Sequence, residues 1–254
     1  SSSAASDVYK RQVHELIKGF AAANINSTRI KGREITTPEA QPMNLVLIML
    51  ESVNNRYLSL FGHNELTMPK MAKYKDRMEI FPLFFSNYPE SSNADVSLMT
   101  GLFPPPHIYL LDKVEYRAQT MVDSLKLAGY HCSLFSSGFI SDSGLAPFYR
   151  SQKYDQIYDP ENLGDLKPKD IWTWGVKKHV MIDRIAEFIN QRKKHDQPFF
   201  LYFRTAFPHA PFRTVTGDHS TFDMSDIAQG SYVGRFKNCM LYLDEQFARL
   251  IEEI

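Results

Sequence analysis

Apolar runs with the length of buried strands alternate along the chain with stretches that have helical spacing. The strand-like runs lie at 45–50, 80–85, 131–135 and 199–203. Each run is short and nearly continuous, as expected for strands that are covered on both faces of a sheet. The alternation therefore predicts an α/β fold, with a mostly parallel sheet sandwiched between helices.

Helical segments fill the intervals between these runs. Periodic apolar residues and capping signals predict helices at 13–24, after 67–69, at 96–102, 119–128, from Thr173 to about 194, and at 232–254. Gly129 follows one of these segments directly, as glycine commonly does at the end of a helix. The stretch 136–170 is rich in Gly, Ser, Pro and Tyr, and we expect it to be mostly loop.

The same pattern divides the chain into three segments. Residues 1–12 are polar and without periodicity, and we interpret them as a non-native tail. Residues 13–43 hold the first helix and a polar linker, and residues 44–254 hold the α/β domain. The last amphipathic helix reaches Ile254 without a cap, so we expect a fragment whose domain is incomplete at its C-terminal end.

Composition excludes some classes of partner. Lys and Arg together number 29, and Asp and Glu also number 29, so no net charge favours binding to nucleic acid. No apolar run approaches the roughly 18 residues that a membrane span requires. Cys132 and Cys239 lie in apolar segments, which predicts two buried free thiols rather than a disulfide framework.

Polar residues stand at two positions where α/β proteins place their chemistry. Glu51 follows the strand at 45–50, while Ser91 and Ser92 precede a helix. A carboxylate at the carboxyl end of a parallel strand can bind a metal, and a hydroxyl at a helix N-terminus can contact an anion. The alternatives are an exposed carboxylate that caps a turn and a serine that caps the helix.

Further candidates lie in the second half of the chain. His209 stands in a Pro-His-Ala-Pro turn, where the prolines hold the imidazole outward, or it is a solvent-exposed loop histidine. Four more residues are possible pocket residues, or else residues that pack or form surface ion pairs: Arg150, Trp172, Trp174 and Arg204. Asp218 and His219 are weak candidates for a metal site, because no apolar strand precedes them.

The order of these motifs resembles the sulfatase-like branch of the alkaline phosphatase superfamily. The resemblance covers residues 44–254 and implies that they are part of a catalytic domain in which Glu51 is a metal ligand. A single Glu at this position is similar to the lipoteichoic acid synthases and phosphoethanolamine transferases. Ser91, nine residues before Thr100 of a Thr-Gly pair, matches the nucleophile and metal ligand. Ser92, one position later, is the alternative hydroxyl and a substrate-binding candidate.

Two more residues match the same pattern. His209, in the sequence His-Ala-Pro-Phe, matches the family histidine that contacts the anionic group of the substrate, which implies a catalytic and a binding role. Trp174, in a Trp-Gly pair before a helix, is similar to the tryptophan of the synthase-like members, which implies a contact with substrate.

Two departures from the family pattern alter the expected chemistry. Formylglycine sulfatases carry Cys or Ser, any residue, Pro, any residue, Arg, whereas Asn93 and Asp95 stand at the Pro and Arg positions after Ser91. Ser91 should therefore remain an ordinary serine, which favours attack on phosphorus over sulfatase chemistry. In the family, a further strand and an Asp-His-Gly motif follow the helix at 232–254 and supply two more metal ligands, and they would lie beyond Ile254.

The resemblance implies a metal-dependent enzyme that transfers or hydrolyses a phosphate-linked head group through a phospho-Ser91 intermediate. The alternatives are a sulfuric ester hydrolase on the same scaffold and a catalytically inactive binding domain. The implied cofactor is a divalent cation, Zn²⁺ or Mn²⁺ before Mg²⁺ or Ca²⁺. The implied substrate is a lipid-derived or small phosphate or sulfate ester outside the cytoplasm, with membrane attachment through a segment that precedes this sequence. The fragment alone is expected to be inactive.

Overall fold

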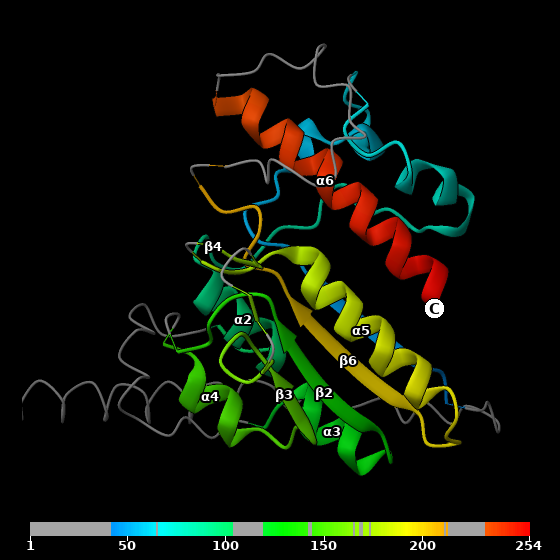
Figure 1. Cartoon of the computed structure of the whole chain (residues 1–254), viewed down its shortest axis with the longest axis vertical. Helices are drawn as coiled ribbons and strands as arrows, with labels where there is room; N and C mark the ends of the chain where they lie inside the picture. Colours follow the sequence, from blue (N-terminus) through cyan, green and yellow to red (C-terminus); the bar gives the residue numbers. More distant parts are fainter. Residues whose placement is uncertain are drawn as a thin grey trace, which may run out of the picture.

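The structure is a computed structural model, and it describes residues 42–64, 66–103, 119–141, 144–164, 166–167, 170–172, 174–210, 212 and 232–254. The predicted tail at 1–12, the predicted helix at 13–24, and Asp218 and His219 lie outside these residues. In the described part of the chain, a central sheet lies between two layers of helices (Figure 1).

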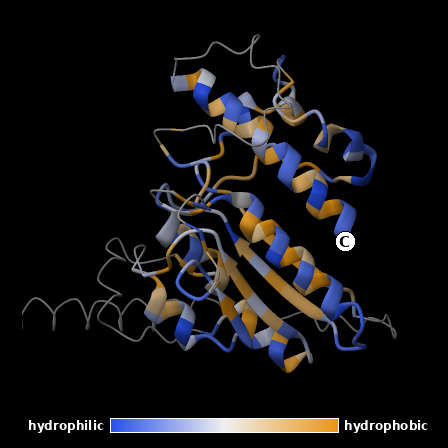
Figure 2. Cartoon of the chain, viewed as in Figure 1, coloured by the Kyte–Doolittle hydropathy of each residue, from blue (hydrophilic) through white to orange (hydrophobic). Residues whose placement is uncertain are grey.

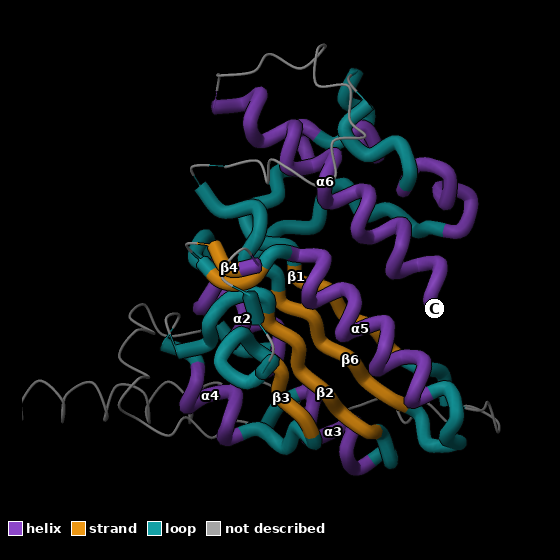
Figure 3. The backbone as a smooth tube through the Cα atoms, viewed as in Figure 1, coloured by secondary structure: helices purple, strands orange, loops and turns teal. Residues whose placement is uncertain are grey.

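Four parallel strands form the central sheet. They are β1 (Leu45–Met49), β2 (His131–Ser136), β3 (Gln156–Tyr158) and β6 (Phe199–Arg204), in the order β1-β6-β2-β3. Strand β6 lies between β1 and β2 (Figure 3), and Tyr202 of β6 is paired in register with Leu47 of β1 and with Leu134 of β2. The predicted parallel sheet is therefore confirmed. Because all four strands run in one direction, their carboxyl ends share one edge, where open α/β sheets bind their ligands.

Alternate residues of the strands enter two separate cores, one on each face of the sheet. One face packs against three short helices, α2 (Ser91–Thr100), α3 (Met121–Leu127) and α4 (Ala146–Ser151). The other face packs against α5 (Lys178–Arg192), and α6 (Tyr232–Glu253) lies beside α5 and contributes to the same core. Strand β6 is mostly hydrophobic, whereas α5 and α6 carry both hydrophobic and hydrophilic residues (Figure 2). None of the described helices combines the length and apolar character needed to cross a membrane.

The helix predicted at 119–128 is present as α3, and local signals set both of its ends. Thr120 and Asp123 form a reciprocal capping box that was not predicted, in which the Thr120 amide donates to Asp123 Oδ2 at 2.9 Å and the Asp123 amide donates to Thr120 Oγ1 at 3.4 Å. Gly129 follows the helix, as predicted, with a φ of 86°, a left-handed conformation that glycine adopts without steric cost. The helix is therefore confirmed, and the capping box makes it begin two residues later than predicted.

The predicted strand at 80–85 is wrong. These residues form irregular chain in the structure, and the side chains of Phe81, Leu83 and Phe84 are 62, 81 and 77% exposed. A strand needs a neighbour with which to exchange backbone hydrogen bonds, and Pro82 has no amide proton to donate. The Pro82 carbonyl instead accepts a hydrogen bond from the Asn55 side chain at 3.3 Å.

The predicted short helix after 67–69 is present, although Thr67 does not cap it. The segment contains three 3₁₀ helices, η1 (Asn55–Tyr57), η2 (Ser59–Phe61) and η3 (Met71–Arg77). The Thr67 hydroxyl donates to the Tyr57 carbonyl at 2.8 Å, far from the start of η3. The carboxylate of Asp244 in α6 takes the capping role, because it accepts from the amides of Lys70 and Met71 at 2.7 Å each.

Three other boundaries differ from prediction. Helix α2 runs from Ser91 to Thr100 rather than over 96–102, because its first turns bury polar residues that an apolar pattern does not detect. The stretch 136–170 contains α4 and β3 in addition to loop. The long helix begins at Lys178 rather than after Thr173, because an antiparallel pair, β4 (Ile171–Trp172) and β5 (Gly175–Val176), occupies the preceding chain. This β4–β5 hairpin lies beside the carboxyl ends of β2 and β6 (Figure 1).

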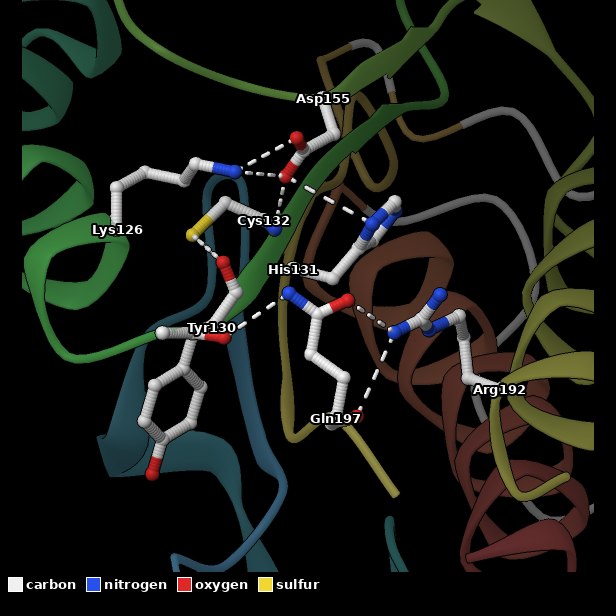
Figure 4. A network of polar contacts seen from close by, with 8 residues as sticks. Lys126, Tyr130, His131, Cys132, Asp155, Arg192 and Gln197 are labelled. Carbon is white, nitrogen blue, oxygen red and sulfur yellow. Dashed lines mark hydrogen bonds and ion pairs between the residues drawn. The ribbon is translucent and has the colours of Figure 1, made fainter. Parts of the chain in front are cut away.

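A polar network closes the amino end of β2, at the opposite edge of the sheet (Figure 4). Asp155 accepts hydrogen bonds from Lys126 Nζ at 2.6 and 2.8 Å and from the Cys132 amide at 2.8 Å. Gln197 Nε2 donates to the Gly129 carbonyl at 3.0 Å, which ties the chain before β6 to the end of α3. Burial opposes ionisation of Asp155, but the hydrogen bonds from Lys126 and Cys132 hold its pKa below the usual value. The network therefore connects α3 and β2 to the chain that precedes β3 and β6, and we assign it a structural role.

Both cysteines are buried and neither forms a disulfide, as predicted. Burial raises the pKa of the Cys132 thiol to about 11, so this thiol stays protonated at neutral pH. A protonated, buried thiol is a poor nucleophile and a poor metal ligand, which leaves the hydroxyl and carboxylate groups as candidates for chemistry.

Candidate active site

The predicted site residues all follow strands or begin helices at the carboxyl edge of the sheet. Glu51 lies just beyond β1, and Ser91 is the first residue of α2. His209 follows β6, and Trp174 lies in the turn between β4 and β5. Helix α2 and the β4–β5 hairpin lie at the edge toward which the β6 arrow points (Figure 1).

Glu51 and Ser91 line one pocket. Its volume is about 280 Å³, and its walls come from the end of β1 and from the chain that leads into α2. The lining residues are Met49, Leu50, Glu51, Ser52, Val53, Ser86, Tyr88, Pro89, Glu90, Ser91 and Ala94. The two residues that sequence analysis assigned to metal binding and nucleophilic attack are thus brought together across some 40 residues of chain.

The backbone around Glu51 is held tightly. The Glu51 amide donates to Thr205 Oγ1 at 3.0 Å, which joins the end of β1 to the end of β6. The Ser52 hydroxyl donates to Glu51 Oε1 at 3.0 Å. Ser52 itself has a φ of 52°, a left-handed conformation that costs a non-glycine residue on the order of 1–3 kcal/mol. A strained backbone conformation persists only where the surrounding structure holds it, and such residues are common at active sites.

Ser91 is not the cap of α2. Glu90 occupies the capping position with extended backbone, and its side chain makes no capping hydrogen bond. The first backbone bond of the helix runs from the Ala94 amide to the Glu90 carbonyl at 3.0 Å, so the amides of Ser91, Ser92 and Asn93 precede the intrahelical ladder. Ser92 is buried and does not line the pocket, so of these two serines Ser91 is the one that lines it.

Trp174 and His209 form a second pair. Their ring centroids lie 4.4 Å apart with an interplanar angle of 38°, and the Trp174 side chain is 41% exposed. The His209 Nδ1 lies 2.9 Å from the Ala210 carbonyl oxygen. Neither residue lines the pocket that holds Glu51 and Ser91. The structure therefore gathers the predicted site residues as two neighbouring pairs at one edge of the sheet.

Glycine allows the backbone crossing that places Trp174. A Cβ built on Gly175 would lie 1.9 Å from the Ser137 carbonyl oxygen, and the φ of Gly175 is 150°. The Val176 amide donates to that same carbonyl at 2.8 Å. A Cβ on Gly138 would lie 2.8 Å from the Ala206 Cβ. Side chains at either glycine would push the hairpin away from β2 and β6, and Trp174 with it.

A buried ion pair beneath Ser91 was not predicted. Asp95 in α2 is 0% exposed and accepts from Arg204 Nε at 2.6 Å and from the Tyr202 hydroxyl. Burial raises the pKa of Asp95, and Arg204 and Tyr202 partly oppose that shift. Burial alone would lower the pKa of Arg204, but Asp95 holds it above its usual value. Arg204 was predicted to be a pocket residue, a packing residue or part of a surface ion pair, whereas its ion pair with Asp95 is buried. The usable signal was an acidic residue inside an otherwise buried helix.

The described residues supply part of a possible metal site. No group of three or more His, Cys, Asp or Glu side chains is placed to hold a metal within the described ranges. Glu51 and Ser91 contribute a half-buried carboxylate and a hydroxyl to one pocket, a donor set of oxygen atoms that suits Mg²⁺, Mn²⁺, Ca²⁺ or Zn²⁺. Catalytic zinc sites commonly use three protein ligands, so these two residues fit a metal only as part of a larger set.

Several solved structures share this fold. The lipoteichoic acid synthase LtaP from Listeria monocytogenes matches with a TM-score of 0.71 and 19% identity, over 83% of this chain and 51% of LtaP. The C-terminal periplasmic domain of EptC from Escherichia coli, solved in complex with Zn, matches with a TM-score of 0.61 and 16% identity, over 84% of this chain and 60% of that domain.

The lipooligosaccharide phosphoethanolamine transferase EptA from Neisseria meningitidis, an integral membrane protein, matches with a TM-score of 0.65 and 16% identity. That match covers 86% of this chain and 40% of EptA, so the chain spans between two fifths and three fifths of the length of these proteins. At such identities, the likeness shows the predicted alkaline phosphatase-like fold. The sequence model of the Sulfatase family matches residues 43–254, most of the chain, and the chain therefore belongs to the sulfatase family.

Proposed function

We propose that the complete protein is a metal-dependent phosphotransferase or phosphate-ester hydrolase in which Ser91 is the nucleophile. The observation that carries the proposal is the shared pocket of Glu51 and Ser91, with Ser91 at the open N-terminus of α2. A covalent mechanism splits one difficult displacement into two easier ones, but a serine hydroxyl needs activation before it attacks.

The N-terminus of α2 suits a phosphoryl group. The amides of Ser91, Ser92 and Asn93 precede the intrahelical hydrogen bonds, and a helix N-terminus carries about half a positive charge. Amide protons oriented in this way bind phosphate oxygens without reorganisation, which stabilises the charge that develops during transfer. A phosphoryl group bound there would be adjacent to the Ser91 hydroxyl.

Glu51 and Ser91 would hold a divalent cation together with further ligands. Such a cation would lower the pKa of the Ser91 hydroxyl and polarise the phosphoryl oxygen. The Ser91 oxygen then forms a bond to phosphorus while the bond to the leaving oxygen breaks. The Ser91 hydroxyl loses one proton to solvent and the leaving alkoxide takes one up, so the number of protons bound does not change. A second hydroxyl, from an acceptor or from water, displaces Ser91 in the reverse sense.

Trp174 and His209 would bind the part of the substrate that extends from the pocket. The imidazole can donate a hydrogen bond to an anionic oxygen, and the partly exposed indole face offers an apolar or cation-binding surface. Ser92 would contribute through its backbone amide, because its side chain is buried. We expect loss of either aromatic residue to raise KM more than it lowers kcat.

The proposed substrate is a lipid-derived phosphate ester handled outside the cytoplasm. LtaP is a lipoteichoic acid synthase, EptA is an integral membrane lipooligosaccharide phosphoethanolamine transferase, and the EptC structure is of a periplasmic domain. We propose by analogy that this protein transfers phosphoglycerol or phosphoethanolamine and is attached to a membrane. A sulfuric ester hydrolase is the second candidate, favoured by the family itself. Asn93 and Asp95 at the Pro and Arg positions of the formylglycine signal favour phosphate.

The complete gene product should be assayed with p-nitrophenyl phosphate and p-nitrophenyl sulfate in the presence of Zn²⁺ or Mn²⁺. We expect phosphate turnover that Ser91→Ala abolishes, a loss of at least about 10³-fold, while Ser92→Ala retains most of it. Mass spectrometry of the quenched wild-type reaction should locate the phosphoryl group on Ser91. An active Ser91→Ala protein would show that the nucleophile lies elsewhere. Turnover of the sulfate alone would favour the second candidate, and turnover of neither ester would favour an inactive binding domain.

A further inference from the structure

We propose that Asp95 and Arg204 are positioning residues, which hold Ser91 in register with Glu51 across the pocket. The inference rests on the proposed function of Ser91 and extends it to a pair of residues that neither face the pocket nor contact a substrate there. Three observations carry the inference: the burial of the pair, its place beneath Ser91, and its connection to Glu51.

Asp95 is tied to the helix turn that presents Ser91. It lies four residues after Ser91, one turn farther along α2, and therefore on the same side of the helix. Its carboxylate is fully buried and engages two donors from β6, the guanidinium of Arg204 and the hydroxyl of Tyr202. Because both donors stand on one strand, rotation or sliding of the first turn of α2 against the sheet would break both bonds.

Arg204 is tied to the other side of the pocket. It is the last residue of β6, and the hydroxyl oxygen of the next residue, Thr205, accepts a hydrogen bond from the Glu51 amide at 3.0 Å. A short path of bonded groups thus links the helix that carries Ser91 to the backbone of Glu51 through the end of β6. The guanidinium also extends toward the β4–β5 hairpin, since a Cβ on Gly138 would lie 3.9 Å from Arg204 Nη1 and 3.0 Å from the Trp174 carbonyl oxygen.

Stability alone is a weak reason for this pair. Buried ion pairs can often be replaced by apolar residues of similar size without loss of stability, because desolvation offsets their attraction. What apolar residues do not reproduce is direction, since a carboxylate with two fixed donors permits one orientation of α2 on β6. The +4 position of Ser91 therefore holds an acid that faces the sheet, where the formylglycine signature carries an arginine.

The test replaces all three polar partners with apolar residues of similar size, in the variant Asp95→Leu/Tyr202→Phe/Arg204→Met of the complete gene product. We expect the variant to fold, with kcat for p-nitrophenyl phosphate lowered about 10- to 100-fold and KM changed less than about threefold, as for a nucleophile displaced by roughly 1 Å. If the triple variant does not fold, Asp95→Glu, which keeps the charge and lengthens the side chain, should show the same split between kcat and KM.

Asp244→Asn provides the matched control. Asp244 is also a fully buried carboxylate with two donors, but these donors are the amides of Lys70 and Met71 at the start of η3 rather than groups of β6. It should lower the melting temperature while leaving kcat of the folded protein within about twofold of wild type. A triple variant that is folded and retains wild-type kcat would overturn the positioning role and leave the pair purely structural.

Amide hydrogen exchange separates failure of this inference from failure of the proposed function. If the wild-type protein turns over no ester, the proposed function fails, but the Ala94 amide still reports the position of the helix turn, because its hydrogen bond to the Glu90 carbonyl closes the first turn of α2. We expect this amide to exchange at least about tenfold faster in the triple variant, with β6 amides unchanged. Equal exchange at Ala94 in both proteins would overturn the inference whatever the activity.

Discussion

A methyl group at position 175 would test how Trp174 is held at the site. In Gly175→Ala the new Cβ would lie 1.9 Å from the Ser137 carbonyl oxygen, a backbone atom that cannot turn aside as a side chain can. The substitution also places an L-residue at a φ of 150°. We expect backbone strain of about 1–3 kcal/mol and a similar cost for displacing the hairpin. The hydrogen bond from the Val176 amide to Ser137, worth about 1 kcal/mol, would be lost with it.

Gly164→Ala is the matched control for this substitution. Gly164 has a φ of 78°, but a Cβ there would meet nothing within 4 Å, so it isolates the conformational cost at about 1–2 kcal/mol. Urea unfolding should give a loss about 2–4 kcal/mol larger for Gly175→Ala than for Gly164→Ala. The indole proton resonance of Trp174 should also shift, because the ring leaves His209. Equal losses for the two variants, with an unchanged indole resonance, would refute the role of Gly175.

Two further predictions concern charge and metal. Hydrogen bonds hold the pKa of Asp155 below its usual value, so its stabilising effect is present above the unfolded-state pKa of about 3.9 and is lost as pH falls through the folded-state value. Urea unfolding between pH 3 and 7 should therefore show a shallower acid-side loss of stability in Asp155→Asn than in wild type. Chelation with EDTA should abolish ester turnover by the complete protein, and Glu51→Gln should lower it at least about 10²-fold at a fixed concentration of Mn²⁺. Activity of Glu51→Gln equal to wild type would exclude Glu51 as a metal ligand.

The sequence predicted correctly those features that depend on neighbouring residues or on burial of a strand on both faces. All six residues of β6 are buried, and its unbroken apolar run is typical of an interior parallel strand. The capping box of Thr120 and Asp123 was not predicted but could have been, because both partners lie within four residues. The run at 80–85 looks the same in sequence whether or not another strand pairs with it, and here it remains exposed. Apolar composition predicts burial, but pairing depends on the rest of the fold.

The candidate site likewise has a part that the sequence could predict and a part that depends on distant contacts. Glu51 and Ser91 could be placed together because both stand at the carboxyl edge of a parallel sheet, and one pocket indeed holds them. Their catalytic roles stay predictions. The ion pair between Asp95 and Arg204 joins residues 109 positions apart, and no local pattern reports a partner at that distance. The contact between Trp174 and His209 depends likewise on a backbone crossing that only the assembled sheet creates.

The charge one turn beyond Ser91 also bears on how this hydroxyl is activated. An unpaired carboxylate at Asp95 would oppose the positive field of the N-terminus of α2, but Arg204 compensates it at 2.6 Å in a buried setting that salt screens little. The field at Ser91 then comes from the helix amides and from any cation that Glu51 binds. About half a charge from the helix cannot ionise a serine hydroxyl at neutral pH, so the proposed nucleophile would need a cation for its activation. We therefore expect chelation and Glu51→Gln to act on one step, so that their effects on kcat do not multiply.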